Sequence, residues 1–562
     1  SLNLMAQTKT ITGTVVDPMG PVIGASVLQV GTTNGTITDI DGKFTLTVPE
    51  NASIRISFIG YKEQVIKVGA QNVFNIVMKE DSEMLDEVVV TGYGGSQKRA
   101  TLTTAISKMD DAVLENAAFS NAAQALQGSV TGLRVINVSG QPGAEPKITL
   151  RGGATITGSN NNALIIVDGV IRDSMNDLNP GDIESIQVLK DAASTAIYGA
   201  RANGGVILVE TKKGKEGKAT VNYKFKMGVN LSRKGYEFLN AGDYIWYNRT
   251  GYKKVNPTNE DGLESQQGYG TKNNLYDIRF LTPETAHLQN EGWLVMDDPV
   301  KEGRQILYKD YGGQLDKAVF DESAFLQEHN VNIMGGNDKG TFAANLGYYH
   351  EDGMVIGTGY KRFNGSVNGS YKIFPFLNVK AGASYNWSTK PSLWIGEDQM
   401  FYRTRSQRPT WNPWDEEGNP TSGGGTSDGN PAYYRDKLTQ KDGKRRQTYN
   451  IGFDLDILPK ELVWTGNASL LHYDYQREKF NKSYHTQTSS TPNNTRHAEA
   501  YMQRYTQLQL NTTLNYTKTF AEKHNVDVML GGEYYTYDKF TFEAKTDNSP
   551  NDDIPTLNVG AT

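Results

Sequence analysis

The chain has 562 residues, enough for several domains or one large architecture, and it carries 57 basic and 63 acidic residues, a net charge of -6. That balance provides no broad cationic surface for nucleic acid, and the absence of cysteine excludes disulfides, thiolate zinc sites and cysteine nucleophiles. The 58 glycines, 30 tyrosines and mean hydropathy of -0.54 favour a mostly β protein, with one face of its sheets exposed to water, over a helical bundle or a disordered chain.

The N-terminal region predicts one small domain. Residues 1–7, SLNLMAQ, are interpreted as the remnant of a secretory signal peptide cleaved after Ala6. Residues 8–80 contain short alternating runs separated by glycine and asparagine turns, which predicts a small antiparallel β-sandwich. Asp39 and Asp41 precede Gly42 and are interpreted as turn residues that bond the backbone, with calcium ligation as the alternative.

Residues 81–99 form a linker that contains one short strand, within the stretch DEVVVTGYG. Val88 to Thr91 are β-branched and favour an extended chain, whereas the acidic segment before them and the glycine-rich segment after them are too polar or too loose to pack. An isolated strand exposes unpaired backbone groups. We therefore expect a domain or a partner protein to cover this strand, the alternative being a linker strand folded against the sandwich.

Residues 100–214 mix helix and strand patterns and predict a compact α+β domain. NAAQALQGSVTGLRVINVS predicts an amphipathic helix that ends near Gly128 and is followed by a strand. KITLRGG and ALIIVDGV are typical of strands, and residues 182–214 predict a strand, a helix, a glycine turn and a second strand.

From residue 215 to residue 562 the sequence alternates apolar and polar residues over long runs, as the strands of a membrane β-barrel do. Nine candidate strands are ATVNYKFKMGVN, HNVNIMGGN, TFAANLGYYHEDG, YKRFNGSVNGSYKI, FLNVKAGASYNWST, QTYNIGFDLDIL, LVWTGNASLLHYDYQ, AYMQRYTQLQLNTTLNYTKTF and HNVDVMLGGEYYTYD. No run reaches the length of about 18 apolar residues that a spanning helix requires.

The connections between these strands are unequal. Residues 337–340, 374–376 and 458–460 are tight turns, whereas residues 231–327 and 388–445 are long polar connections. Short turns at one end and long loops at the other are typical of an outer-membrane barrel. Because nine is an odd number and an open sheet edge is not tolerated in lipid, we expect the chain to be part of a longer protein that holds the rest of the barrel.

No enzymatic motif is present in the sequence. His350-Glu351-Asp352-Gly353 lacks the second histidine of a metalloprotease helix, and residues 153–159 lack the lysine of a phosphate loop. No Gly-x-Ser-x-Gly elbow occurs. We therefore predict no catalytic residue, no metal and no cofactor.

Three groups of motifs together resemble one family, the SusC-like (SusC/RagA) branch of the TonB-dependent outer-membrane transporters. ITGTVVDPMGPVIGASV and ISFIGYK resemble the carboxypeptidase-regulatory-like sandwich of that family, and DEVVVTGYG is similar to its TonB box. ITLRGG, ALIIVDGV and IESIQVLKDAASTAIYGARANGGVILVETKKG resemble its plug domain, and residues 334–388 resemble its early barrel strands.

The resemblance implies an incomplete barrel of about 22 strands with a plug in its lumen. It implies that TonB pulls on the segment Glu87, Val88, Val89, Val90, Thr91 and Gly92 to remodel the plug, and that Arg151, Gly152, Gly153, Asp168 and Gly169 belong to plug motifs. The implied partners are the TonB-ExbB-ExbD complex, a SusD-like surface lipoprotein, outer-membrane lipids and a glycan or peptide substrate, with no nucleic acid. The N-terminal domain would lie in the periplasm.

Other interpretations remain open. Trp411 and Trp414 lie in the segment FYRTRSQRPTWNPWDEEGNP, where they would either stack on sugar rings or belong to a structural loop. Within the transporter class, a siderophore or cobalamin receptor is the alternative, although the N-terminal sandwich disfavours it. Outside that class, the alternatives are a surface adhesion protein built from β-sandwich modules and an envelope enzyme with a regulatory sandwich.

Overall fold

The computed structural model comprises two compact units, Ser1–Thr104 and Ala105–Thr562. It describes residues 8–559 except for 18–19, 23, 31, 33, 50, 59–60, 62, 79–87, 93–94, 99–105, 111–121, 129–131, 138, 151–162, 191–194, 233–236, 392, 394–396, 424–428, 460, 486–490 and 522–523. The segment 1–7 interpreted as a signal-peptide remnant lies outside these residues. In the described part of the chain, no helix has both the length and the apolar character needed to cross a membrane.

The first unit contains the β-sandwich expected from the alternating runs. One sheet consists of β2 (Gly20–Pro21), β1 (Thr8–Asp17), β5 (Lys43–Pro49) and β8 (Val73–Val77), the other of β4 (Gly35–Ile37), β3 (Ser26–Gln29), β6 (Ser53–Ser57) and β7 (Gln64–Lys67). Alternate side chains of β5 are buried in the core. The Asp39 carboxylate accepts hydrogen bonds from the backbone N–H groups of Asp41 (3.0 Å) and Lys43 (2.8 Å), as the turn interpretation predicts.

The short strand of the linker is β9 (Val88–Gly92), and it is paired in the structure. It forms an antiparallel hairpin with β10 (Gly95–Lys98), in which Val88 lies opposite Lys98 and Val89 opposite Gln97. The sequence predicted no neighbour for this strand within the linker, because the glycines after it were interpreted as a loose segment. Those glycines instead let the chain reverse, and among the described residues the second edge of β9 is bonded to no strand.

The α+β domain is built on a five-stranded sheet of order β11-β16-β17-β14-β15, in which only β14 and β17 run parallel. Its strands are β11 (Ile106–Asp110), β14 (Leu164–Val167), β15 (Val170–Arg172), β16 (Ile183–Leu189) and β17 (Val206–Thr211). The hairpin β12 (Leu133–Ile136) with β13 (Lys147–Leu150) and helix α3 (Ala122–Ala125) pack on its apolar core.

Two local features of this domain refine the sequence prediction. In place of the predicted helix before the last strand, η3 (Ala196–Ala202) consists of two 3-10 turns that meet at a kink, where Gly199 takes a non-helical φ of 62°. Asp168 (φ 48°) and Gly169 (φ 84°) form the two central positions of the turn that joins β14 to β15, the pattern of a type I′ hairpin. A second 3-10 turn, η2 (Pro180–Asp182), precedes β16.

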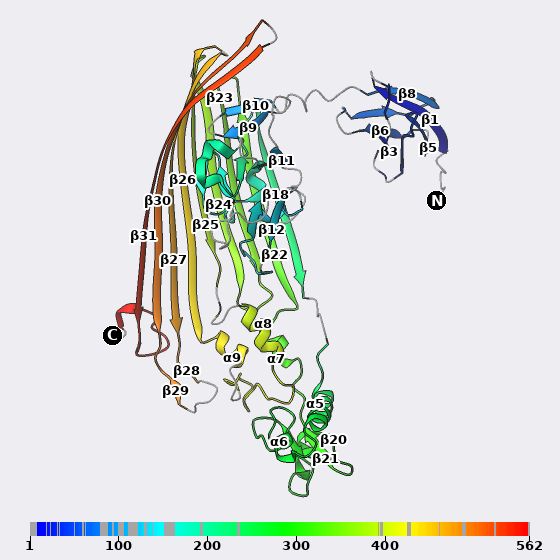
Figure 1. Ribbon diagram of the computed structural model, residues 1–562, viewed down its shortest axis with the longest axis vertical. Helices are drawn as coiled ribbons and strands as arrows, with labels where there is room; N and C mark the ends of the chain where they lie inside the picture. The colour runs from blue at the N-terminus through cyan, green and yellow to red at the C-terminus, as the bar shows by residue number, and fades with distance from the viewer. Residues whose placement is uncertain are drawn as a thin grey trace. The chain divides into compact units, whose positions relative to one another are not determined.

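All nine predicted long strands join one antiparallel sheet in sequence order, which Figure 1 shows as strands running side by side. Its strands are β18 (Gly217–Leu231), β22 (Ser323–Gly336), β23 (Gly340–Asp352), β24 (Gly359–Phe374), β25 (Leu377–Thr389), β26 (Leu438–Leu458), β27 (Leu462–Asn481), β30 (Ala498–Phe520) and β31 (His524–Thr546). The mostly β fold class, with a sandwich, an α+β domain and the first part of a barrel-type sheet, is confirmed.

The two faces of this sheet are inverted relative to those of a soluble protein. On the face toward the α+β domain, buried polar side chains include Asn332, Asn345 and Asn364, whereas large apolar side chains such as Leu346 and Val367 are exposed on the opposite face. Alternation of this sense is typical of a membrane β-barrel, whose strands carry apolar residues outward and polar residues inward.

Tight turns join the sheet at one end, as predicted, but the long connections at the other end are folded. The first holds α5 (Ala241–Val255), α6 (Glu260–Glu264), β19 (Ile278–Phe280), η4 (Ala286–Glu291), β20 (Leu294–Asp297), β21 (Gln305–Tyr308) and α7 (Gln314–Val319), and the second holds α8 (Glu397–Arg405) and α9 (Pro431–Arg435). Near the last strands lie β28 (Tyr484–His485), β29 (Pro492–Asn493) and η5 (Leu557–Val559).

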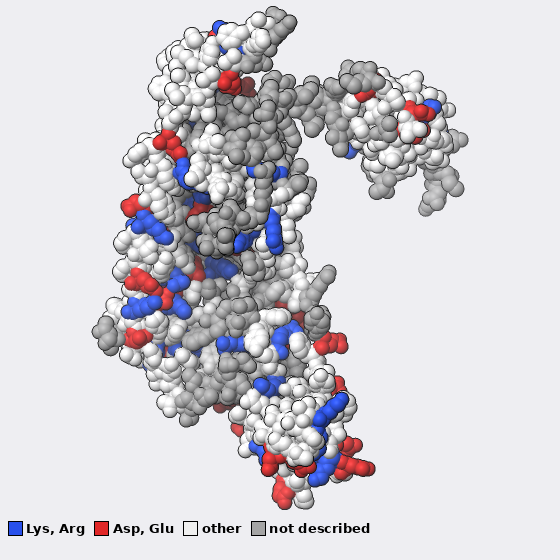
Figure 2. Space-filling view, viewed as in Figure 1, with Lys and Arg blue, Asp and Glu red and all other residues white. Residues whose placement is uncertain are grey.

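We call residues 237–320, together with the described part of 397–436, the connection subdomain. Ile245 and Ile306 from the first connection and Met400 and Trp411 from the second lie in one apolar core, so the two segments fold together. Acidic side chains gather on its surface at the bottom of the view in Figure 2. Its polar exterior explains why the sequence pattern indicated only long polar loops.

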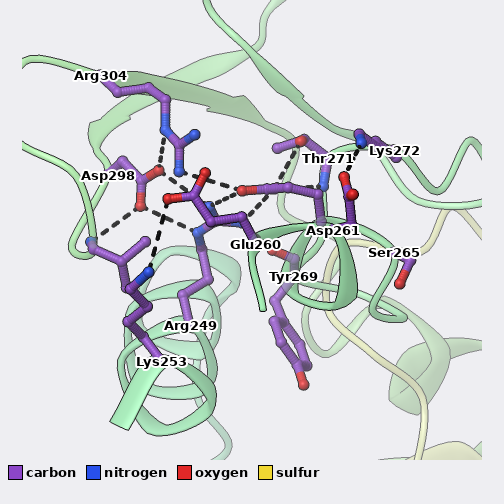
Figure 3. A network of polar contacts seen from close by, with 12 residues as sticks. Arg249, Lys253, Glu260, Asp261, Ser265, Tyr269, Thr271, Lys272, Asp298 and Arg304 are labelled. Carbon is purple, nitrogen blue, oxygen red and sulfur yellow. Dashed lines mark hydrogen bonds and ion pairs between the residues drawn. The ribbon is translucent and has the colours of Figure 1, made fainter. Parts of the chain in front are cut away.

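A buried ionic cluster ties the elements of the connection subdomain together (Figure 3). Arg249 of α5 is fully buried and donates two hydrogen bonds to Glu264 (2.8 and 3.0 Å) and two to Asp298 (3.0 and 3.2 Å). Arg304 donates to the same two carboxylates, at 3.2 Å and 2.6 Å. Two cations and two anions therefore balance in a site that joins α5, α6 and the end of β20.

We expect Arg249→Met to destabilise the connection subdomain by about 3–5 kcal/mol, because Glu264 and Asp298 would keep buried charges with half of their compensation removed. Limited proteolysis of the folded protein should then cleave within residues 237–320 at much lower protease concentration. Lys272→Met, which breaks the exposed pair with Asp261, is the matched control and should change the cleavage little. Equal cleavage of the two variants would contradict a structural role for the cluster.

Candidate functional site between the α+β domain and the sheet

A row of four asparagine side chains lies on the inner face of four neighbouring strands, hydrogen-bonded as two pairs. Asn332 Nδ2 donates to Asn345 Oδ1 (2.8 Å), and Asn364 Nδ2 donates to Asn386 Oδ1 (2.6 Å). These residues occupy β22, β23, β24 and β25, and each side chain is 6% exposed or less. An asparagine amide carries both donors and an acceptor, so a row of this kind can pass hydrogen bonds across the strands and still bind a second layer.

The second layer comes from the α+β domain, mainly from the segment between β15 and β16 and also from Lys212 after β17. Asn179 Nδ2 donates to Asn330 Oδ1 (2.7 Å), and Asn364 Nδ2 donates to the carbonyl oxygen of Asp177 (2.5 Å). Asn368 Nδ2 donates to the carbonyl oxygen of Lys212 (3.1 Å). Polar side chains of the sheet thus position the domain through its backbone as well as through its side chains.

Two glutamines of β30 satisfy the free edge of the domain's sheet at β15. The N–H of Ile171 donates to Gln509 Oε1 (3.3 Å), and Gln509 Nε2 donates to the carbonyl oxygen of Gly169 (3.1 Å). Gln507 Nε2 donates to the carbonyl oxygen of Ile171 (3.0 Å). An edge strand presents unpaired N–H and C=O groups, and here side-chain amides take the place of a neighbouring strand. We call this arrangement the glutamine clamp.

A cluster of charges connects the same region to β26. Arg446, which is 4% exposed, donates to the carboxylates of Asp173 (2.5 Å) and Asp177 (2.7 Å). Arg172 lies 4.0 Å from Asp177 and donates to Thr448 Oγ1 (3.2 Å). Burial alone would raise the pKa of Asp177, but the nearby Arg446 and Arg172 outweigh that effect and hold the pKa below its usual value.

Asp182 is also buried in this interface. Burial raises the pKa of its carboxyl to about 6, and the positive charge of Arg362 and hydrogen bonds with Asn179 and Asn332 only partly oppose this. The carboxyl therefore changes its charge near the neutral range, unlike the ion-paired Asp177.

A cavity of about 240 Å³ lies between the α+β domain and strands β24 to β27. Its wall on the sheet side includes Tyr360, Asn386, Lys444 and Tyr473, and its wall on the domain side comes from Gly143, Glu145, Asp173, Ser174, Asn176 and Asp177. No group of three or more His, Cys, Asp or Glu side chains that could hold a metal ion occurs within the described residues. The side chains that line the cavity include charged residues such as Asp173, Asp177, Lys444 and Arg446.

The structure brings only some of the predicted site residues to this interface. Asp168 and Gly169 form the turn at the start of β15, where the carboxylate of Asp168 accepts hydrogen bonds from the N–H (3.1 Å) and hydroxyl (2.6 Å) of Thr211. Arg151, Gly152, Gly153 and Glu87 lie outside the described residues. Val88 to Gly92 form β9, which belongs to the unit Ser1–Thr104.

The two predicted tryptophans lie in the connection subdomain, not at the interface. Trp411 is 6% exposed and its ring is part of the apolar core, so it offers no open face to a sugar and the structural alternative fits it. Trp414 is half-buried at the edge of that core, and its Nε1 donates to Gln314 Oε1 (2.9 Å). For Trp414, stacking on a ligand stays a prediction.

Sequence reasoning did not identify Gln507, Gln509, Arg446 or the asparagine row. The one feature of the sequence that could have indicated them is their position in the alternating pattern. Each is a polar residue at a position of a long strand whose side chain faces inward. Any inward polar residue has that property, so the pattern does not distinguish those that contact the domain from those that face water.

Comparison with known proteins places two regions in described families. Residues 11–90 match the CarboxypepD_reg-like domain, and residues 98–206 match the TonB-dependent Receptor Plug Domain. The chain is 34% identical over 379 residues to the TonB-dependent receptor SusC of Bacteroides thetaiotaomicron, a match that covers 66% of this chain and 32% of SusC. It is 28% identical over 552 residues to TonB-dependent receptor P39 of Formosa agariphila, covering 94% of this chain and 46% of the relative.

Among solved structures, the RagAB peptide importer in its open-open state has the same fold, with a TM-score of 0.65, 22% identity, and coverage of 85% of this chain and 52% of the other. The chain thus spans less than half the length of the two curated relatives described above.

We expect Gln509→Leu to loosen β15, because the buried N–H of Ile171 would lose its acceptor at a cost of about 1–3 kcal/mol. Hydrogen-exchange mass spectrometry on a peptide spanning residues 169–172 should show roughly tenfold faster exchange, the factor that corresponds to about 1.4 kcal/mol. Gln476→Leu is the matched control, since this exposed glutamine lies on the neighbouring strand β27. Unchanged protection in Gln509→Leu would show that the clamp does not hold the strand.

We expect Asp182→Asn to remove a pH-dependent cost of folding. The folded-state pKa of about 6 lies above the ordinary value of 3.8 for an aspartate side chain, so the contribution of Asp182 to stability is fully present below pH 3.8 and is lost as pH rises through about 6. At about 1.36 kcal/mol per pKa unit, the loss approaches ~3 kcal/mol. Apparent Tm, measured for both proteins from about pH 4 to pH 8, should therefore shift in favour of the variant as pH rises; a difference independent of pH would contradict the assignment.

Proposed function

Because this chain belongs to the SusC-like branch of the TonB-dependent receptors, we propose that it forms the N-terminal part of a transporter that imports a large nutrient, an oligosaccharide or a peptide, across the bacterial outer membrane. In this proposal the α+β domain is the plug, and the nine-stranded sheet is part of the barrel wall that surrounds it. The sandwich and the hairpin β9-β10 lie on the periplasmic side.

The observation that carries the proposal is the docking of the plug on the buried polar face of a sheet whose other face exposes apolar side chains. Such a sheet is stable when lipid covers its apolar face and hydrogen-bonding groups cover its polar face. A plug held by side-chain amides meets the second requirement and closes the passage at the same time. Opening the passage then requires work on the plug.

That work has to be delivered mechanically, because the outer membrane holds no nucleotide pool or bulk ion gradient of its own. β9 is suited to receive a pull, since among the described residues its outer edge is bonded to no strand and a partner strand could add there. We propose that TonB, energised by ExbB and ExbD, binds residues 87–92 in this way. Force along the strand loads all of the added hydrogen bonds together.

The proposal includes two further contacts. A SusD-like surface lipoprotein would cover the end of the sheet that carries the connection subdomain, where a folded and rigid surface is present. Outer-membrane lipids would cover the exposed apolar face, for example at Leu346 and Val367.

The test is Val89→Pro in the full-length receptor, because proline removes a backbone donor from β9. We expect TonB-dependent uptake of the nutrient to fall at least about tenfold, equivalent to ~1.4 kcal/mol of lost pairing, while outer-membrane assembly and nutrient binding stay unchanged. Gln97→Pro is the control, since it disturbs the opposite strand of the hairpin and leaves every donor of β9 in place. Normal uptake in Val89→Pro, or equal loss in both variants, would reject β9 as the strand that TonB binds.

A further inference from the structure

The cavity between the plug and strands β24 to β27 has walls of opposite charge. Glu145, Asp173 and Asp177 line it from the plug, whereas β26 contributes the basic Lys444, Arg445 and Arg446 together with one acidic residue, Asp442, so that its charge is positive on balance. The two sets of side chains belong to different layers of the molecule. A molecule in this cavity therefore meets negative charge on one side and positive charge on the other.

Some of these charges already have partners within the structure. Arg446 is bound to Asp173 and Asp177, and Tyr475 donates to Asp442 Oδ1 (3.0 Å). The carboxylate of Asp173 nevertheless remains 57% exposed, so its pairing with Arg446 leaves much of it open to the cavity.

Two charges in the cavity form no direct ion pair among the described residues, although Lys444 is close enough to Asp177 to help lower the pKa of that carboxyl. Glu145 on the plug and Lys444 on β26 are both exposed, and the described part of the chain places no oppositely charged group within ion-pair distance of either. The contact of Lys444 there is with the ring of Tyr475, at 5.9 Å from the ring centre. A ligand with a positive and a negative group would supply both missing partners.

The aromatic side chains of the cavity do not form an open platform. Tyr473 stacks on Tyr505 with ring centres 4.7 Å apart, and the guanidinium of Arg446 lies 5.1 Å from the Tyr473 ring. The Tyr475 ring has Tyr501 at 5.8 Å in addition to Lys444. A sugar ring packs best on an uncovered aromatic face, and here the rings are engaged by neighbouring side chains.

We infer that this cavity binds a short peptide through its charged termini, with the amino terminus at Glu145 and Asp173 and the carboxylate at Lys444. The inference rests on the proposed import function and chooses the peptide over the oligosaccharide as the cargo bound at this place. The buried side chains of Asn386 and Ser388, which also line the cavity, provide polar atoms for the peptide backbone.

The experiment is isothermal titration calorimetry on the full-length receptor in detergent, with three probes of different charge. Tetraalanine carries both terminal charges, N-acetyl-tetraalanine amide carries neither, and maltohexaose is an uncharged oligosaccharide. We expect tetraalanine to bind at least about tenfold more tightly than the capped peptide, and maltohexaose not to compete. Binding of tetraalanine should also weaken as salt is raised, because part of the attraction is between partly exposed charges.

Variants locate the binding in this cavity. Lys444→Gln and Glu145→Gln should each weaken tetraalanine binding by about fivefold, the factor for one partly exposed ion pair of about 1 kcal/mol, and should leave the capped peptide unaffected. Lys441→Gln and Glu302→Gln are the matched controls, because both side chains are exposed and neither lines the cavity.

Two results would overturn the inference: equal affinity for the free and capped peptides, or tight binding of maltohexaose that Lys444→Gln weakens. Either result, together with uptake that Val89→Pro abolishes, would reject the peptide and leave the import function standing. Normal uptake in Val89→Pro, together with charge-dependent peptide binding at Lys444, would reject the proposed TonB strand and leave the cavity assignment standing.

Discussion

The nine-stranded sheet has a polar face that is buried, and the arrangement of the molecule depends on how that face is satisfied. Amide groups buried without partners cost free energy, so Asn332, Asn345 and Asn364 must find donors and acceptors. They find some in each other and the rest in the plug. The apolar contact between the layers is small by comparison, with Val170 of the plug against Leu471 and its neighbours.

An interface made of hydrogen bonds behaves differently from an apolar one when it opens. Each bond contributes about 0.5–1.5 kcal/mol net, and water can replace it without exposing apolar surface. The core of the plug is the reverse case, because Ile183, Ile186 and Val188 are fully buried among apolar neighbours. Separating the plug from the sheet therefore requires less free energy per unit of surface than unfolding the plug itself. A plug that moves as a unit would require this difference.

The fold could be predicted further than the site. Alternation along each strand was sufficient to identify all nine strands of the sheet and their order, because antiparallel strands joined by short connections pair with their neighbours in sequence. The glutamine clamp joins residues 336 to 340 positions apart, and that distance carries no local signal. The sequence did not predict the hairpin partner of β9 for a different reason. Gly92 and Gly95 were interpreted as part of a flexible segment, although glycine also permits the tight turn of a hairpin.

The charges of the cavity connect binding to the position of the plug. Its acidic wall belongs to the plug and its basic residues belong to β26, so in the proposed transporter a ligand that bridges Glu145 and Lys444 would stabilise the seated plug. Displacement of the plug separates the two walls, and the ligand then keeps one charged contact at most. Arg446, which pairs with Asp173 and Asp177 across the same boundary, loses its partners in the same step. Under the proposed function, release of the ligand and release of the plug would therefore be one event, because both depend on the same separation of charge.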